Sequence, residues 1–94
     1  MSAMFNPPHP GAIVKESMES LELSINGFAK ALKVSPSTVQ RLVNGKSSVS
    51  PEMALRLEAV IGSTASMWLR LQSSYDLWNV RKNVDVSTLQ SLRQ

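Results

Sequence analysis

Apolar residues recur at helical spacing along most of the chain, and capping or turn residues interrupt them at intervals. A first helix is expected from Pro10, because proline suits the first helical position, and Ser24 can cap a second helix. Ser35-Pro36 and Ser50-Pro51 repeat such a start signal, and Thr64 precedes a long fifth apolar pattern. No segment alternates as a strand does, so the sequence predicts an all-α fold of five helices with a long fifth helix.

The two ends of the chain depart from this pattern. Prolines at positions 7, 8 and 10 exclude a helix there, so residues 1–8 are expected to form an extended arm. Residues 83–94 are expected to form a short C-terminal tail. Ser87 and Gln90 fit a capping box within it, so a final helix would be short and marginal. The predicted domain is therefore residues 9–82.

The second and third helices are predicted to form a helix-turn-helix, because about three residues join them. A small residue is needed where the two helices cross, and Ala29 has that position. Apolar residues fall where they can hold the pair together, namely Phe28, Leu32, Val34, Val39 and Leu42. Lys33 stands where the turn usually takes glycine. One residue there adopts positive φ, which costs a non-glycine residue on the order of 1 kcal/mol.

The third helix has a polar face opposite its buried positions, Val39 and Leu42. With a period of about 3.6 residues, this face presents short hydroxyls, amides and one guanidinium. Its members are Ser37, Gln40, Arg41 and Asn44, with Thr38 at the edge and Lys46 just past the helix. Arginine can pair bidentately with guanine, and glutamine or asparagine with adenine. We interpret the polar face as a surface that binds DNA, with Lys46 at a phosphate.

The distribution of charge favours the same interpretation. The 94-residue chain carries a formal net charge of +3, which is only mildly basic. Between Leu23 and Ser50 there is no acidic residue, yet this window holds Lys30, Lys33, Arg41 and Lys46. Positive charge gathered in one place is expected of a phosphate-binding surface. A solvated face that happens to lack acids is the alternative explanation.

Catalytic and metal-binding candidates are few. The chain has no cysteine, so it has neither disulfides nor a thiolate metal site. His9 is the single histidine and lies between prolines without a nearby acid, so we expect it to cap or pack. We therefore predict no enzyme, no metal and no cofactor. The first residues lack the pattern of a signal peptide, and no apolar stretch approaches the roughly 20 residues that span a bilayer. A cytoplasmic protein without membrane contact is expected.

The predicted fifth helix has two apolar faces. One is a continuous stripe formed by Trp68, Leu71, Tyr75 and Trp78. Leu69, Leu77 and Val80 fall largely off that stripe. A domain this small can bury one such face, and large aromatic residues are favoured at interfaces. The stripe is therefore predicted to form part of a homodimer interface, and the alternative is a central, fully buried helix.

The segment SINGFAKALKVSPSTVQRLVNGK resembles the helix-turn-helix of the lambda-repressor-like superfamily. NPPHPG near the start, RLVNGKSSVSPEMALRLE in the middle and WLRLQSSYDLW near the end resemble more closely the HigA antitoxins. The resemblance implies a five-helix DNA-binding fold, a homodimer, and repression of the protein's own toxin–antitoxin operon through double-stranded operator DNA. It also implies neutralisation of a HigB-type toxin, a ribonuclease.

The resemblance also implies roles for individual residues. It places base-reading positions at Ser37, Thr38, Gln40 and Arg41, and contacts to the DNA backbone at Asn44 and Lys46. A stand-alone repressor of the phage type, without a toxin partner, is the alternative function. A protein-interaction module that does not bind DNA is a weaker alternative, because it leaves the polar face of the third helix unexplained.

Overall fold

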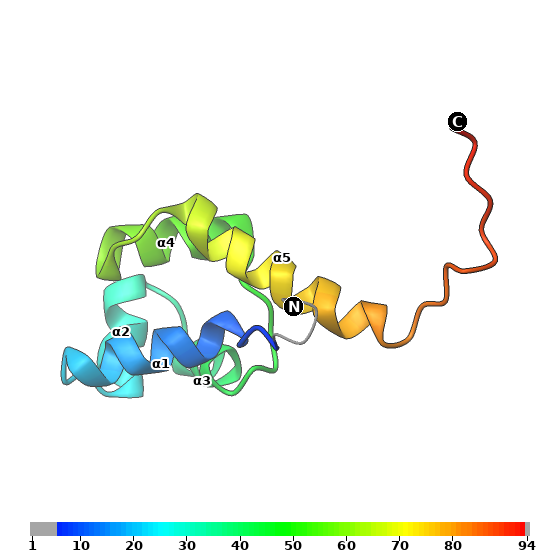
Figure 1. Ribbon diagram of the computed structural model, residues 1–94. Coiled ribbons are helices and arrows are strands. Elements are labelled where there is room, and N and C mark those ends of the chain that lie inside the picture. The colour runs from blue at the N-terminus through cyan, green and yellow to red at the C-terminus, as the bar shows by residue number, and fades with distance from the viewer. Residues whose placement is uncertain (1–5, 94) are drawn as a thin grey trace.

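A computed structural model describes residues 6–93, which form five α-helices and no strand. The helices are α1 (Pro10–Ser20), α2 (Ile25–Leu32), α3 (Pro36–Val43), α4 (Pro51–Ile61) and α5 (Ala65–Arg81). The predicted all-α fold and the predicted start of each helix are confirmed. Figure 1 shows the first four helices gathered into one body, from which the end of α5 and the C-terminal tail project. Most of the predicted arm, residues 1–5, lies outside the described residues.

Every helix begins at a residue whose side chain accepts a hydrogen bond from a backbone N–H of the first turn. The caps are His9, Ser24, Ser35, Ser50 and Thr64. Proline follows the cap directly in α1, α3 and α4, where its missing N–H costs nothing. Each cap contributes about 1 kcal/mol relative to alanine, so the helix starts are specified locally.

Three helices end in a Schellman motif, in which a left-handed residue turns the chain away from the helix axis. Glu22, Lys33 and Gly45 are the left-handed residues, with φ of 58°, 60° and 74°. After α2, the N–H of Val34 donates to the carbonyl of Ala29 at 3.0 Å. The same bond after α3 runs from Lys46 to Arg41 at 2.8 Å. The positive φ expected of Lys33 is confirmed, whereas the left-handed conformation of Glu22 was not anticipated.

Substitution of Lys33 by glycine should raise the free energy of unfolding by about 0.5–1 kcal/mol. It removes the steric cost of a left-handed lysine, and the greater freedom of glycine in the unfolded chain offsets part of that gain. Urea unfolding followed by circular dichroism would measure the change. Lys30→Gly, at an exposed position inside α2, is the matched control and should lose about 1 kcal/mol. Equal losses from both substitutions would contradict the account of the turn.

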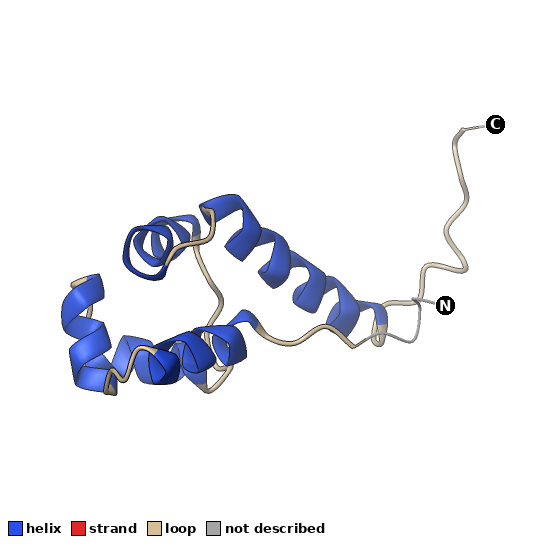
Figure 2. Ribbon diagram, turned by 60° about the vertical axis from the view of Figure 1, so that its left-hand side comes forward, coloured by secondary structure: helices blue, strands red, loops and turns tan. Residues whose placement is uncertain are grey.

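The core lies between the helix-turn-helix and the last two helices. α2 packs on α3 and α4, α1 packs on α3 and α5, and α4 packs on α5. Figure 2 shows α1, α2 and α3 on one side of this core, with α4 and α5 on the other. The largest fully buried side chains include Phe28, Leu32, Leu42, Leu57 and Trp68. Ala29 is buried too, as predicted for the residue where the helices of the helix-turn-helix cross.

The start of α1 lies directly against the backbone of α3. A Cβ atom added to Gly11 would stand 1.9 Å from the carbonyl oxygen of Leu42. Real Cβ atoms do not approach backbone so closely, so a side chain at position 11 would force the two helices apart. The first helix is therefore held at the C-terminal end of α3 by a contact that requires glycine.

The aromatic stripe of α5 faces the domain itself. Trp68 is 2% exposed, and its indole N–H donates to the carbonyl of Gly62 at 3.2 Å. The prediction of Trp68 as an interface residue is therefore wrong, because the body of the domain already covers it. Leu71 packs against the core, and Tyr75 makes an edge contact with His9. Trp78 is half-buried, with the ammonium of Lys82 above its ring.

Residues 82–93 contain turns but no helix, so the short final helix did not form in the part of the tail that is described. The hydroxyl and then the backbone N–H of Ser87 donate to Asp85, and both bonds hold the pKa of this carboxyl below its ordinary value.

No helix within residues 6–93 has the length and apolarity required to traverse a bilayer.

Candidate nucleic-acid interface

Helix α3 has one buried apolar face and one exposed polar face, as the sequence predicts. Val39 and Leu42 are buried in the core. The predicted DNA-binding residues Ser37, Gln40, Arg41, Asn44 and Lys46 are exposed, and Thr38 is half-buried. The structure thus brings all six onto one helix and the turn that follows it. Their contact with DNA stays a prediction.

The N-terminus of α3 carries a cluster of three hydroxyls. The Oγ of the cap, Ser35, accepts from the N–H of Thr38 at 3.2 Å. It also lies 2.8 Å from the Thr38 hydroxyl and 3.1 Å from that of Ser37. These side chains are short and tied to one another, so they leave the first turn of the helix open to close approach. A helix N-terminus attracts anionic groups through its unpaired N–H groups and its dipole.

The guanidinium of Arg41 has no acidic partner among residues 6–93. The ion pair formed within that range joins Arg56 to Glu52 at 2.7 Å, on α4. Arg41 is therefore free to donate two parallel hydrogen bonds to an external acceptor pair, the geometry in which arginine recognises guanine. Gln40, beside it, is exposed and can serve a second base.

Arg56, on α4, holds the turn of the helix-turn-helix in place. Its Nη1 donates to the carbonyl of Leu32 at 2.7 Å, at the end of α2. Its Nε and Nη2 donate to Glu52, which holds the side chain in place. This role was not predicted from the sequence. The i,i+4 spacing of Glu52 and Arg56 predicts the ion pair, but nothing in the sequence indicates the carbonyl that Arg56 reaches.

His9 joins three elements near the end of α3. Its Nδ1 accepts the N–H of Gly11 at 2.8 Å, which confirms the predicted capping role. Its ring meets that of Tyr75 edge-on, with centroids 4.8 Å apart. A Cβ atom on Gly45 would lie 3.7 Å from the same imidazole. The histidine therefore packs between α5 and the turn that ends α3.

The segment between α3 and α4 is tied to α5 by Gln72, whose role was also not predicted from the sequence. Gln72 is 5% exposed, and its Oε1 accepts the N–H of Val49 at 2.8 Å. One signal could have found it, since Gln72 stands four residues after Trp68 on the inward face of α5. A polar side chain in such a position needs a partner inside the protein.

Comparisons with known proteins match this architecture. The helix-turn-helix family HTH_3 matches residues 14–68. The chain is 47% identical over 89 residues to YddM, an HTH-type transcriptional regulator of Escherichia coli (strain K12), and the match covers 95% of each chain.

Two solved structures from Pseudomonas aeruginosa are also similar. One is PA4674 in complex with an 18-base-pair operator DNA, with 31% identity, a TM-score of 0.82 and coverage of 94% of this chain and 96% of the other. The second is the antitoxin HigA with the higBA promoter, with 32% identity, a TM-score of 0.78 and coverage of 89% and 99%.

Proposed function

The chain belongs to the HTH_3 helix-turn-helix family, and from this premise we propose that it represses its own operon and neutralises a HigB-type ribonuclease toxin. It is a DNA-binding regulator of the HigA antitoxin type rather than an enzyme. The exposed polar face of α3 is the observation that carries the DNA-binding half of the proposal. The toxin-binding half rests on similarity to HigA antitoxins.

The proposed complex places α3 in the major groove of a double-stranded operator. Arg41 and Gln40 read base edges there, while Ser37 and Thr38 let the first turn of the helix approach closely. Asn44 and the ammonium of Lys46 then lie beside the DNA backbone. Footprinting of the DNA upstream of the chain's own gene tests this half, and protection of a symmetric site is the expected result.

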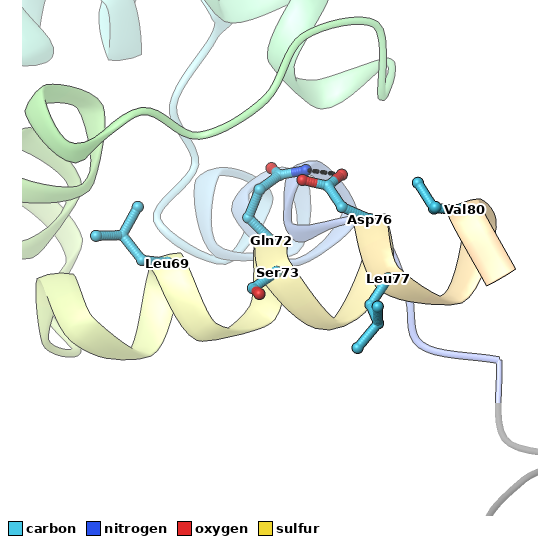
Figure 3. A pocket seen from close by; sticks show the side chains of 6 residues that line it. All are labelled: Leu69, Gln72, Ser73, Asp76, Leu77 and Val80. Carbon is cyan, nitrogen blue, oxygen red and sulfur yellow. Dashed lines mark hydrogen bonds between the residues drawn. The ribbon is translucent and has the colours of Figure 1, made fainter. Parts of the chain in front are cut away.

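A homodimer is part of the proposal, because one helix-turn-helix contacts too few base pairs to be selective. A shallow groove runs along the side of α5 that carries the exposed Leu77 and Val80 (Figure 3). It is lined by Leu69, Gln72, Ser73, Asp76, Leu77 and Val80. Leu77 and Val80 are each 50% exposed. This side of α5, in place of the aromatic stripe, is the proposed site of contact with a second copy.

Replacement of Leu77 by glutamate should shift the protein from dimer to monomer and weaken operator binding, because it removes an apolar side chain from the proposed contact and adds a second negative charge beside Asp76. Sedimentation velocity across the micromolar range measures the first effect. Leu55→Glu is the matched control, because it charges a leucine on α4 that is somewhat more exposed than Leu77, and it should leave the dimer intact. Two half-sites about 34 Å apart, or a multiple of it, are expected in the operator. A natural chain that stays monomeric at tens of micromolar yet binds its operator tightly would contradict the dimer.

The proposed toxin-binding surface is the outer side of α1. A ribonuclease that binds RNA should be basic, yet this chain also has a net charge of +3, so overall charge cannot attract the two. Three exposed acids cluster locally on α1 and the turn after it, namely Glu16, Glu19 and Glu22. Glu16 also borders a groove with Leu21 and Ile61, where acidic and apolar surface adjoin. Long basic side chains of a toxin fit this combination, because their stems are apolar and their ends are charged.

Reversal of Glu16, Glu19 and Glu22 to lysine should abolish toxin neutralisation while operator binding survives. Growth after toxin induction measures neutralisation, and a gel-shift assay measures DNA binding. Lys15→Glu, on the same helix, is the opposite change and should retain or strengthen toxin binding. Full neutralisation by the triple variant, or competition between toxin and operator for one surface, would contradict this site. A chain that lacks a toxin-sized gene beside its own would instead be a stand-alone repressor.

A further inference from the structure

The connection from α3 to α4 has no regular structure, yet one of its residues, Val49, is buried. The connection includes Lys46, the exposed residue proposed to meet phosphate, and Val49, which is 3% exposed. The N–H of Val49 does not bond within its own segment. It donates to the side chain of Gln72 on α5, 23 positions further along the chain. The position of the connection therefore depends on α5.

Asp76 fixes which end of the Gln72 amide faces Val49. The Nε2 of Gln72 donates to Oδ1 of Asp76 at 2.9 Å, and Figure 3 shows the two side chains next to each other on α5. An ionised carboxylate can only accept, so it draws the NH₂ end of the amide towards itself. The carbonyl end is then left for the N–H of Val49. With the amide reversed, its NH₂ would meet another N–H, and both hydrogen bonds would be lost.

A second contact holds the beginning of the connection. The ring of His9 lies against Gly45, and the ring of Tyr75 supports His9 edge-on. Tyr75 stands three residues after Gln72 on α5. The chain between Gly45 and Val49 is thus fixed at both ends by one stretch of α5. Lys46 stands between these two fixed points.

We infer that Gln72, oriented by Asp76, is a positioning residue of the DNA interface, and that it sets where the connection after α3 meets the phosphate backbone. This inference rests on the proposed DNA-binding function of α3. Phosphate contacts beside a base-reading helix fix the orientation of the protein on the duplex. The residues that make them must therefore be held at a defined position relative to that helix. Gln72 holds the connection in that position from α5, without contacting DNA itself.

Gln72 and Asp76 also line the groove proposed as the dimer contact, so sedimentation velocity first shows that each variant remains a dimer. A glutamine that served stability alone would then leave DNA binding by the folded dimer unchanged, so the test reads out DNA binding at several salt concentrations. Gln72→Met keeps the length of the side chain and removes both hydrogen bonds. It should weaken binding to operator and to scrambled DNA alike, by about tenfold, and flatten the plot of log affinity against log salt by about one per protomer. The preference for operator over scrambled DNA should persist.

Two further variants keep the inference testable if Gln72→Met folds poorly. Asp76→Ala leaves Gln72 and the apolar core in place, and it should change the salt dependence in the same direction by a smaller amount. Asp76→Asn retains an acceptor oxygen but adds a donor, so it should have an effect between those of the natural chain and Asp76→Ala. Val14→Ala, a core truncation on α1, controls for lost stability and should leave the salt dependence unchanged while the protein is folded.

The outcomes separate the inference from the proposed function. If the natural chain shows no preference for any operator, the proposed DNA-binding function fails. If the natural chain is selective, but folded Gln72→Met and Asp76→Ala keep its salt dependence and its affinity, the positioning role is overturned. Loss of affinity at all sequences together with a flatter salt dependence supports it.

Discussion

Arg41→Ala should weaken operator binding by roughly 1–3 kcal/mol per half-site and remove the preference for one base pair in each. The guanidinium is exposed on the polar face of α3, opposite the buried Val39 and Leu42, and no acid within residues 6–93 competes for it. In a dimer the effect counts twice, because both copies lose the contact. Affinities for a set of operators, each with a single base pair changed, would locate the position that Arg41 reads.

Lys46→Ala is the matched control for Arg41→Ala. Both substitutions remove one exposed positive charge from the same surface. Lys46 is expected at a phosphate, so its loss should weaken all sequences about equally and reduce the salt slope by about one per protomer. Its loss should leave the order of preference among operators unchanged. A folded Arg41→Ala variant with natural operator affinity would refute the proposed role of this residue.

Gly11→Ala should lower the free energy of unfolding by about 2–4 kcal/mol, a large effect for one methyl group. The added Cβ would fall 1.9 Å from the carbonyl oxygen of Leu42. That oxygen belongs to the backbone of α3 and also accepts the N–H of Gly45, so it cannot move without disturbing the end of the helix. Urea or thermal unfolding measures the loss.

Gly27→Ala is the control for Gly11→Ala, because it replaces a helical glycine by alanine at a position without a close backbone contact. Its added Cβ would lie 3.3 Å from the Ser24 hydroxyl and 3.7 Å from a methyl group of Leu23, and both are side-chain atoms. Alanine favours a helix over glycine by roughly 1 kcal/mol, which offsets a small adjustment of the cap. Stability within about 1 kcal/mol of the natural chain is expected. If the two glycine variants unfold alike, the contact between α1 and α3 is not as tight as described.

The helix starts could be predicted because their causes are local. A capping side chain followed by proline, as at Ser35 and Ser50, specifies the first turn without reference to the rest of the molecule. The left-handed Glu22 was missed for the opposite reason. No glycine marks that turn, and the backbone hydrogen bond that closes it, from the N–H of Leu23 to the carbonyl of Met18, cannot be read from residue types.

For the fifth helix, the spacing of apolar residues predicted the helix but not which of its faces is buried. Spacing alone identified two apolar faces but could not tell which one the domain would cover. Trp68 was assigned to an interface, yet it lies in the core, while the face with Leu77 and Val80 stays exposed. The choice depends on how α5 packs against α1 and α4, and those contacts join residues far apart in sequence.

The polar face of α3 could be predicted because the positions that face the core are apolar, so the opposite side follows from geometry. The residues that hold this face in place could not be predicted. Gln72 reaches Val49, and Arg56 reaches Leu32, through bonds that span more than twenty residues. Every residue except proline has the same backbone donor and acceptor, so the sequence does not indicate which of them a distant side chain will bind. Such partners are known only once the fold is known.

The side-chain caps also bear on how fast the protein folds. Each helix carries its own start signal, and α2 with α3, as well as α4 with α5, pack as neighbours along the chain. A fold built mainly from such local contacts has a low contact order, and folding within microseconds to milliseconds is typical of it. Folding of one chain would then be complete long before two chains meet at cellular concentrations. If the proposed dimer is the form that binds the operator, encounter between subunits would accordingly set how quickly newly made protein begins to bind DNA.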